Sequence, residues 1–292
     1  MSNKYFILIS FTIVLVFVHK KNYSLGIDEN LLKFRQLISD SENINYSEKN
    51  KLNYYSDSIK KAIDKSVNFF KNKDKIDAQS YLILDYLIRK YEIPLSIDKS
   101  KVKNAFNENG LNSSFDFFYG IIEPEAIKTV VPDTFNNPME QSLIRALLCK
   151  EKPVDEKFLD FLEAQINSGG YQLTHAVIAL IWLRENQCII NEKRTKGMIN
   201  TSINLLLELA KKERYNTDIG IEAMAVLCYS GNYKKIKPFM ISEVLKVQKA
   251  NGSWAHSPET TITDEHTTIL AFWLLLGVEY HRLNPAVKWI VK

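Results

Sequence analysis

Histidine and carboxylate side chains occur at three points of the sequence where a helix is expected to begin. His175 lies in the first turn of one of these helices, Glu222 in the first turn of the next, and His266 in the first turn of the last. Two imidazoles and a carboxylate can transfer protons near neutral pH, and they can also bind Zn²⁺ or Fe²⁺. We therefore take these three residues as candidates for catalysis, provided that the fold brings them together.

Four further side chains in the same regions are candidates for binding a ligand: Asp218, Trp254, His256 and Asp264. Acidic residues at the start of a helix also have a purely structural explanation, because they cap free backbone N–H groups and interact favourably with the helix dipole. None of the fixed spacings that identify a metal site, such as H-E-x-x-H, is present in the sequence. The identity of any metal, cofactor or ligand is therefore left open.

The elements that carry these residues are predicted to be helices. Between Leu52 and Phe70, for example, apolar residues recur at steps of three and four while lysines lie on the opposite face. No convincing strand alternation occurs, so the fold class is predicted to be all-α. The segment 104–137 is less regular and is expected to hold short helices and long connections. Further helices are expected at residues 78–91, 138–150, 157–165, 173–185, 194–211, 218–230, 236–248 and 264–280.

A repeat of 46 residues relates three of these predicted helices. Segments 174–183, 220–229 and 266–275 align at this spacing, and each has an alanine at the same position: Ala179, Ala225 and Ala271. Each segment is apolar on every side from its fourth residue, which is typical of a buried helix, whereas the helices between them are amphipathic. We therefore expect the repeated segments to be inner helices whose polar amino ends meet at one mouth of a central cavity.

Two short motifs accompany the repeat, each of the form L-x-x-Q-x-x-x-G-x-aromatic. The first runs from Leu162 to Tyr171 and the second from Leu245 to Trp254. The second resembles the QW motif of the triterpene cyclase and prenyltransferase superfamily. In such a motif we expect the glutamine to bond the end of a neighbouring helix, the glycine to make a tight turn, and the aromatic ring to stack over the junction. The resemblance implies an α/α toroid, in which five or six helical hairpins form a single domain over residues 27–292.

The resemblance covers residues 140–280 and does not extend to the catalytic motifs of such proteins. The D-x-D-D motif of triterpene cyclases is absent, since the nearest acidic cluster, residues 263–266, reads T-D-E-H. The zinc ligands of protein prenyltransferase β-subunits cannot be placed, and the G-C-G-E-Q run of complement thioester domains does not occur. We therefore expect a small apolar or glycan-like ligand in the central cavity. The alternatives are an enzyme, either related to terpenoid cyclases and prenyltransferases or glycan-processing, and a protein-interaction scaffold.

The amino terminus has the composition of an export signal or a membrane anchor. After Lys4, an apolar or weakly polar run extends over residues 5–18 and is followed by Lys20 and Lys21. Such a run is long enough for the core of a signal peptide but short for a bilayer-spanning helix. Residues 1–26 are therefore interpreted as a signal peptide or anchor, with a buried helix as the alternative. Either form of leader places the domain outside the cytoplasm, and an uncleaved one gives contact with the membrane.

Charge and cysteine content limit the possible functions further. The 292-residue chain has a formal net charge of +4, but residues 1–26 hold three lysines and no acid, which leaves +1 for the remainder. Nucleic-acid binding is therefore not expected, because no basic patch remains. The three cysteines, Cys149, Cys188 and Cys228, lie far apart and are expected to be buried thiols. One disulfide with a spare cysteine is the alternative in an oxidising compartment.

Overall fold

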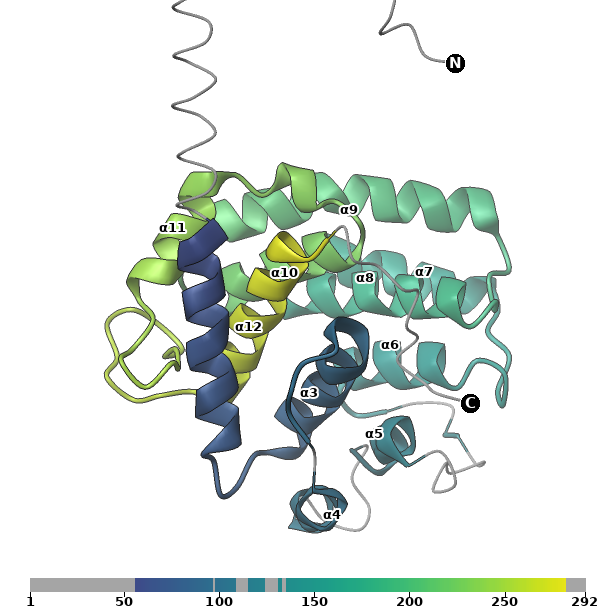
Figure 1. Cartoon of the computed structure of the whole chain (residues 1–292). Helices are drawn as coiled ribbons and strands as arrows, with labels where there is room; N and C mark the ends of the chain where they lie inside the picture. Colours follow the sequence, from purple (N-terminus) through teal and green to yellow (C-terminus); the bar gives the residue numbers. More distant parts are fainter. Residues whose placement is uncertain (1–55, 97, 109–114, 124–130, 133–134, 282–292) are drawn as a thin grey trace, which may run out of the picture. The chain divides into compact units, whose positions relative to one another are not determined.

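Helices make up most of the structure (Figure 1). The computed structural model describes residues 56–96, 98–108, 115–123, 131–132 and 135–281. No β-strand occurs within these ranges, where the strand-like pairing is confined to one isolated bridge between Trp254 and Asp264. The prediction of an all-α fold is therefore confirmed. The predicted leader, residues 1–26, lies outside the described residues, as does the segment 27–55.

A helix at residues 56–71 opens the described part of the chain, and η3 (Tyr233–Lys235) is a short 3₁₀ turn near its end. Each helix predicted from residue 78 onward is present, with bounds that differ from the prediction by three residues or fewer. Of two short helices, α4 overlaps the start of the less regular segment 104–137 and α5 lies within it. The helices are α3 (Ala78–Tyr91), α4 (Lys99–Glu108), α5 (Phe115–Ile122), α6 (Pro138–Leu147), α7 (Glu156–Ser168), α8 (Gly170–Glu185), α9 (Glu192–Lys212), α10 (Asp218–Tyr229), α11 (Pro238–Lys246) and α12 (Glu265–Glu279).

Capping side chains explain why many of these helices begin where they do. In six of them a side-chain oxygen accepts a hydrogen bond from a backbone N–H of the first turn, a group that has no partner within the helix. The capping residues are Asp77, Asn137, Asp155, Asn191, Thr217 and Asp264. Polar residues therefore mark the helix starts in the sequence, and the same starts later supply the polar wall of a cavity.

Three helices, α8, α10 and α12, form the centre of the core. α10 packs against both of the others, and most residues of all three are buried. Ala179, Ala225 and Ala271 are each 0% exposed, which confirms that the repeated segments are buried helices. Burial on every side stabilises such a helix, because each Å² of apolar surface removed from water contributes about 25 cal/mol.

The helices between these inner ones are amphipathic and lie outside. α9 turns Met198, Ile199 and Leu206 toward the core and packs against α8 and α10. At its exposed end, Arg194 donates hydrogen bonds to three carboxylates of α7. This surface network orients α9 against α7 but adds little stability, since exposed ion pairs are worth about 0–1 kcal/mol.

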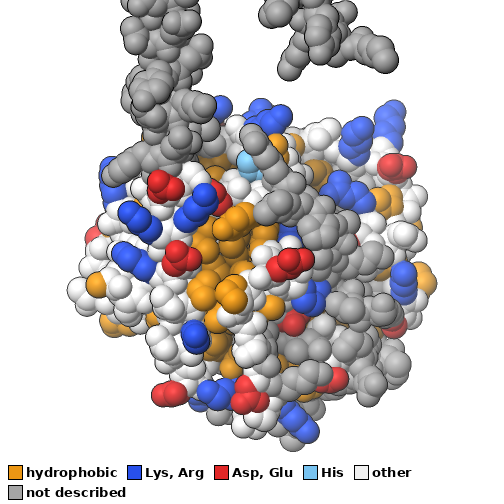
Figure 2. Space-filling model, in the orientation of Figure 1, with side chains coloured by type: hydrophobic (Ala, Val, Ile, Leu, Met, Phe, Trp, Pro, Cys, Tyr) orange, Lys and Arg blue, Asp and Glu red, His pale blue; other side chains and the backbone are white. Residues whose placement is uncertain are grey.

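Inner helices that are far apart in the sequence lie next to one another. α6 contacts α8, α8 contacts α10, and α10 contacts α12. The last labelled helix, α12, then contacts α3, the first labelled helix, and α5 packs on α3. An apolar depression is bordered by the carboxyl ends of α3 and α12 and by the helix at residues 56–71. Charged side chains lie at its edge (Figure 2).

The turn after α11 is formed by the second of the two short motifs, residues 245–254. Gln248 donates a hydrogen bond to the carbonyl oxygen of Ala62 at 2.9 Å, inside the helix at residues 56–71 rather than at its end as expected. Gly252 makes the predicted turn with φ of 91°. Trp254 is fully buried and its indole N–H donates to the carbonyl oxygen of Val244 at 2.9 Å. The glutamine and the tryptophan thus tie this turn to two helices.

The first motif does not repeat this arrangement. The side-chain oxygen of Gln165 is buried without a hydrogen-bond partner among the described residues. Gly169 and Gly170 both have positive φ and separate α7 from α8. Tyr171 lies in the first turn of α8, and its hydroxyl donates to Oδ2 of Asp218 at 2.6 Å. The aromatic residue of this motif therefore belongs to a polar cluster rather than to a buried junction.

A disulfide joins Cys149 and Cys188, the residues that follow α6 and α8. The expectation of three buried thiols is therefore wrong for this pair, and the alternative of one disulfide with a spare cysteine holds. The spare residue is Cys228 in α10, where burial raises the pKa of the thiol to about 12. Within the described ranges, every helix is too short or too polar to cross a bilayer.

Candidate functional site

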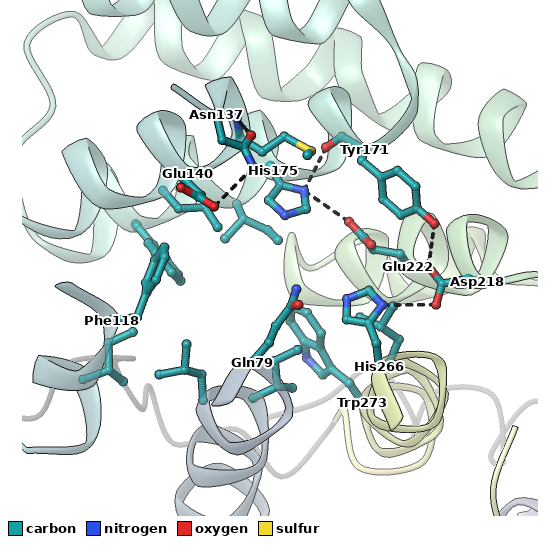
Figure 3. A pocket seen from close by; sticks show the side chains of 18 of the residues that line it. Gln79, Phe118, Asn137, Glu140, Tyr171, His175, Asp218, Glu222, His266 and Trp273 are labelled. Atoms are coloured by element: carbon teal, nitrogen blue, oxygen red, sulfur yellow. Dashed lines mark hydrogen bonds and ion pairs between the residues drawn. The ribbon is translucent and has the colours of Figure 1, made fainter. Parts of the chain in front are cut away.

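A cavity of about 480 Å³ lies among the first turns of α3, α6, α8, α10 and α12, with α5 on one side (Figure 3). Polar side chains from the helix starts line one part of it: Tyr171, His175, Asp218, Glu222 and His266. Apolar side chains from later turns and from α5 line the rest, among them Phe118, Ile178, Trp182, Leu270 and Trp273. The cavity is therefore amphipathic, with a charged wall facing an apolar one.

Helical spacing explains this division. On α8, His175 follows Tyr171 by four residues, and Ile178 lies one turn further along the same face. On α12, Leu270 follows His266 by four residues and so lies on the same face. Because each helix presents its first turn to the cavity, the capping and charged residues that start helices become neighbours. The prediction that His175, Glu222 and His266 share one cavity is thereby confirmed.

Asp218 is the most extensively bonded group of the polar wall. Its side chain is 3% exposed and accepts hydrogen bonds from the hydroxyls of Tyr171 and Thr267, at 2.6 and 2.5 Å. Nδ1 of His266 lies 3.1 Å from Oδ1 of Asp218. Since a carboxylate oxygen only accepts, the Nδ1 atom of His266 carries a proton and donates to Asp218.

The protonation of this pair follows from its surroundings. Burial alone would lower the pKa of His266, but the hydrogen bond and the charge of Asp218, together with Glu222 and Asp264, raise that pKa to about 9. Burial alone would raise the pKa of Asp218, whereas His266, Thr267 and Tyr171 hold it below its usual value. At neutral pH the two residues are therefore an aspartate and an imidazolium.

His175 is held in one tautomer by the backbone of its own helix. Its Nδ1 lies 2.8 Å from the carbonyl oxygen of Tyr171 and 3.4 Å from Oε1 of Glu222. A carbonyl oxygen cannot donate, so Nδ1 carries the proton, and in the neutral ring Nε2 holds the lone pair. The Nδ1 atoms of both histidines are therefore donors, and His266 is the imidazolium of the pair with Asp218.

Glu222 differs from Asp218 in the way its two oxygens are used. The side chain is 3% exposed, and Oε1 accepts a short hydrogen bond from the hydroxyl of Thr174. Oε2 is buried and has no hydrogen-bond partner among the described residues. A buried polar atom without a partner costs about 1–3 kcal/mol, and more when it is charged. Figure 3 shows this carboxylate between His175 and His266, beside the cavity.

The other candidate residues occupy different positions. The exposed side chain of His256 lines the cavity, while its carbonyl oxygen accepts a hydrogen bond from the N–H of Asp218. Asp264 caps α12 and lies at a separate open depression beside Lys73 and Glu265. Trp254 is not among the residues that line the cavity. It is buried in the turn after α11, where its role is structural.

One group of residues in the described ranges has the spacing of a metal site. Ligand atoms of Asp218, Asp264 and His266 all lie within 4.8 Å of one another. These residues already have other roles, because Asp218 receives the Nδ1 proton of His266 and Oδ1 of Asp264 caps the N–H of Thr267. A metal ion would have to displace the proton of an imidazolium that is stabilised to about pH 9. The geometry therefore favours an ion pair here.

Several lining residues were not among the predicted site residues. Tyr171 was assigned to a structural motif, yet it stands four residues before His175 on the same helical face. Gln79, Phe118 and Glu140 reach the cavity from helices outside the 46-residue repeat. Helical spacing could have identified Tyr171, whereas no local pattern singles out the other three.

Comparison with family models, with curated proteins and with solved structures found no match for this chain. We therefore base the functional proposals on the cavity and on the residues that line it.

Proposed function

We propose that the protein binds a small amphipathic molecule in the cavity at the first turns of its inner helices. The single observation that carries this proposal is the composition of the cavity wall. A volume of about 480 Å³ is bounded on one side by a partly buried ion pair and a buried carboxylate, and on the other by aromatic and aliphatic side chains. Concave apolar sites with a few converging polar groups are typical of small-molecule binding.

The apolar part of the ligand would lie against Phe118, Trp182 and Trp273, and its polar part would face His175, Glu222 and His266. A glycan-like ligand fits this wall less well, because most of the lining is apolar. A protein-interaction scaffold would need no cavity of this size and would instead bind its partner through an exposed apolar patch on the outer helices. The cavity therefore supports small-molecule binding over these alternatives.

A fluorescent apolar probe tests the proposal directly. N-phenyl-1-naphthylamine should bind the full chain in a 1:1 complex, with an increase in its emission. Ile178→Trp fills the apolar part of the cavity and should weaken binding by at least tenfold, as this side chain lines the cavity. Leu205→Trp, at a position of α9 that is 37% exposed, adds the same ring outside the cavity and should bind as the unaltered protein does. Equal binding by both variants would contradict the proposal.

Proton transfer is a second candidate function, favoured by the two histidines. One ring is held as an imidazolium by Asp218, and the other presents a basic Nε2, so an acid and a base face the same cavity. Histidine ¹⁵N NMR tests this assignment. At pH 7.5 His266 should be doubly protonated, and Nδ1 of His175 should carry a proton. A neutral His266 ring, or a His175 ring with its only proton on Nε2, would remove the acid–base pair.

We further propose an α/α toroid as the architecture. It is supported by the succession of neighbouring inner helices from α6 to α12 and by the contact between α12 and α3. Export of the domain is proposed as well, since disulfides such as Cys149–Cys188 persist mainly in oxidising compartments. A reporter fused after residues 1–30 should be carried across a membrane, and retention of that reporter in the cytoplasm would contradict export.

A further inference from the structure

The charge of the cavity lining is strongly asymmetric. Three carboxylates line it, Glu140, Asp218 and Glu222, and no lysine or arginine is found among the described residues that do so. The imidazolium of His266 compensates Asp218 through their hydrogen bond. With the other histidines counted as neutral, the lining carries a formal charge of −2. An anionic ligand would therefore meet net repulsion, whereas a cation would be attracted.

Glu222 gives this charge a specific location. Its side chain is 3% exposed, so the carboxylate is screened from solvent, and charges interact more strongly there than at the surface. The donors that reach Oε1 leave Oε2 without a partner among the described residues. Asp218, by contrast, accepts hydrogen bonds on both of its oxygens. Of these two buried carboxylates, Glu222 is the one with an oxygen atom, Oε2, that lacks a donor among the described residues.

Aromatic rings supply the second element of the same recognition. Phe118, Trp182 and Trp273 line the cavity opposite the carboxylates. The face of an aromatic ring carries negative charge density and attracts ammonium groups, with an effect that increases when the cation is desolvated. An apolar wall without aromatic rings would offer a cation no advantage over a neutral ligand. The combination of aromatic rings and carboxylates therefore favours cationic ligands over neutral and anionic ones.

We infer that the ligand of this cavity is an organic amine, bound as its ammonium ion, with the cationic group at Glu222 and its hydrocarbon part against the aromatic wall. The inference rests on the proposed small-molecule binding and deepens it by naming the class of ligand. Binding neutralises the buried negative charge of Glu222 and provides a donor for its carboxylate.

Three probes of nearly equal shape test the inference by calorimetric titration of the full chain at pH 7.5. They are 1-naphthylmethylamine, which is a cation, 1-naphthylmethanol, which is neutral, and 1-naphthaleneacetate, which is an anion. The amine should bind at least tenfold more tightly than the alcohol, and the anion should bind most weakly. Glu222→Gln should reduce affinity for the amine by at least tenfold and affinity for the alcohol much less, because the alcohol carries no charge to pair with the carboxylate. Glu208→Gln, which removes the same charge from the exposed face of α9, should change neither affinity.

The outcomes separate this inference from the proposed function. If the alcohol or the anion binds as tightly as the amine, the amine inference is wrong, although small-molecule binding stands. If none of the three probes binds, and N-phenyl-1-naphthylamine also fails, the proposed function is wrong as well. The comparison of probes in the unaltered protein decides the matter even if Glu222→Gln does not fold. In that case Glu140→Gln, at a half-buried position of the lining, should lower affinity for the amine alone.

Discussion

Nδ1 of His266 lies 3.1 Å from Oδ1 of Asp218, a residue 48 positions earlier in the sequence. The contact joins the first turn of α12 to the first turn of α10, and it places an ion pair at the edge of the cavity. Because Asp218 also accepts the hydroxyls of Tyr171 and Thr267, its orientation is fixed from three sides. The pair thus contributes to the core and to the site at the same time.

The first prediction concerns the pH dependence of stability. The pKa of His266 is raised to about 9 in the folded chain, so the stabilisation by its proton is complete below its unfolded pKa of about 6.5 and is lost as the pH rises through 9. The full difference corresponds to roughly 3 kcal/mol. Denaturant titrations of the unaltered protein should therefore show the free energy of unfolding falling between pH 6.5 and pH 9.5.

Asp218→Asn and His266→Gln serve as controls for this prediction, since each removes the ion pair and should flatten the pH profile above 6.5. On the acidic side, the lowered pKa of Asp218 adds stability above the unfolded value near 4, which is lost as the pH falls through the folded value. An unaltered protein whose stability is constant from pH 6.5 to 9.5 would show that the pair is not ionised as inferred.

The second prediction concerns the disulfide. Without reductant, the denatured chain should expose one thiol per molecule to a thiol reagent, that of Cys228, and three after reduction. Closing a loop across the 39 positions between Cys149 and Cys188 stabilises the fold by ~4 kcal/mol in the chain-entropy treatment. A Cys149→Ala, Cys188→Ala variant should lose stability of this order, while the free energy of unfolding of Cys228→Ser should change much less.

Much of the fold could be predicted because the signals were local. Helix starts were marked by capping residues such as Asp77 and Asp264, and the inner helices by the repeated alanines at 179, 225 and 271. The capping residues and the repeated alanines each lie within or next to the helix that they identify. The bounds of α3, 78–91, were predicted to the residue from its apolar periodicity.

Features that depend on the packing of distant segments could not be predicted in this way. Cys149 and Cys188 become neighbours only because α6 packs against α8. Glu140 and Phe118 reach the cavity from α6 and α5, whose positions no repeat indicates. The convergence of His175 and Glu222 was predictable, since the repeat related their helices, but the unpartnered oxygen of Glu222 depends on the orientation of a single side chain.

The third prediction compares two glycines with positive φ. At Gly252, with φ of 91°, a Cβ atom would overlap the carbonyl oxygen of Lys65. Gly252→Ala should therefore cost more than the roughly 1 kcal/mol expected for the left-handed backbone alone. Gly231 has φ of 84° with nothing near the position of a Cβ, so Gly231→Ala should cost about that smaller amount. Denaturant titrations that show equal losses would mean that the turn can shift away from Lys65.

The last prediction separates a functional role of Glu222 from a structural one. Replacing this carboxylate by Met removes a buried charge with an unpartnered oxygen, and it leaves neither donor without an acceptor. The hydroxyl of Thr174 and the Nδ1–H of His175 both have the carbonyl oxygen of Tyr171 within reach, at 2.9 and 2.8 Å. Glu222→Met should therefore leave stability unchanged or raise it by about 1 kcal/mol, as is common when a site is relieved of a strained functional group.

Asp218→Leu is the matched comparison, because it removes the other buried carboxylate of the same helix. That change deprives His266, Tyr171 and Thr267 of a shared acceptor and should destabilise the protein by about 3–5 kcal/mol. Thermal and denaturant unfolding of the two variants, measured at pH 7, gives the comparison directly. A loss for Glu222→Met as large as that for Asp218→Leu would mean that Glu222 holds the helices together. An unchanged or raised stability, together with weaker binding of 1-naphthylmethylamine, would show that the chain keeps this buried carboxylate for its ligand.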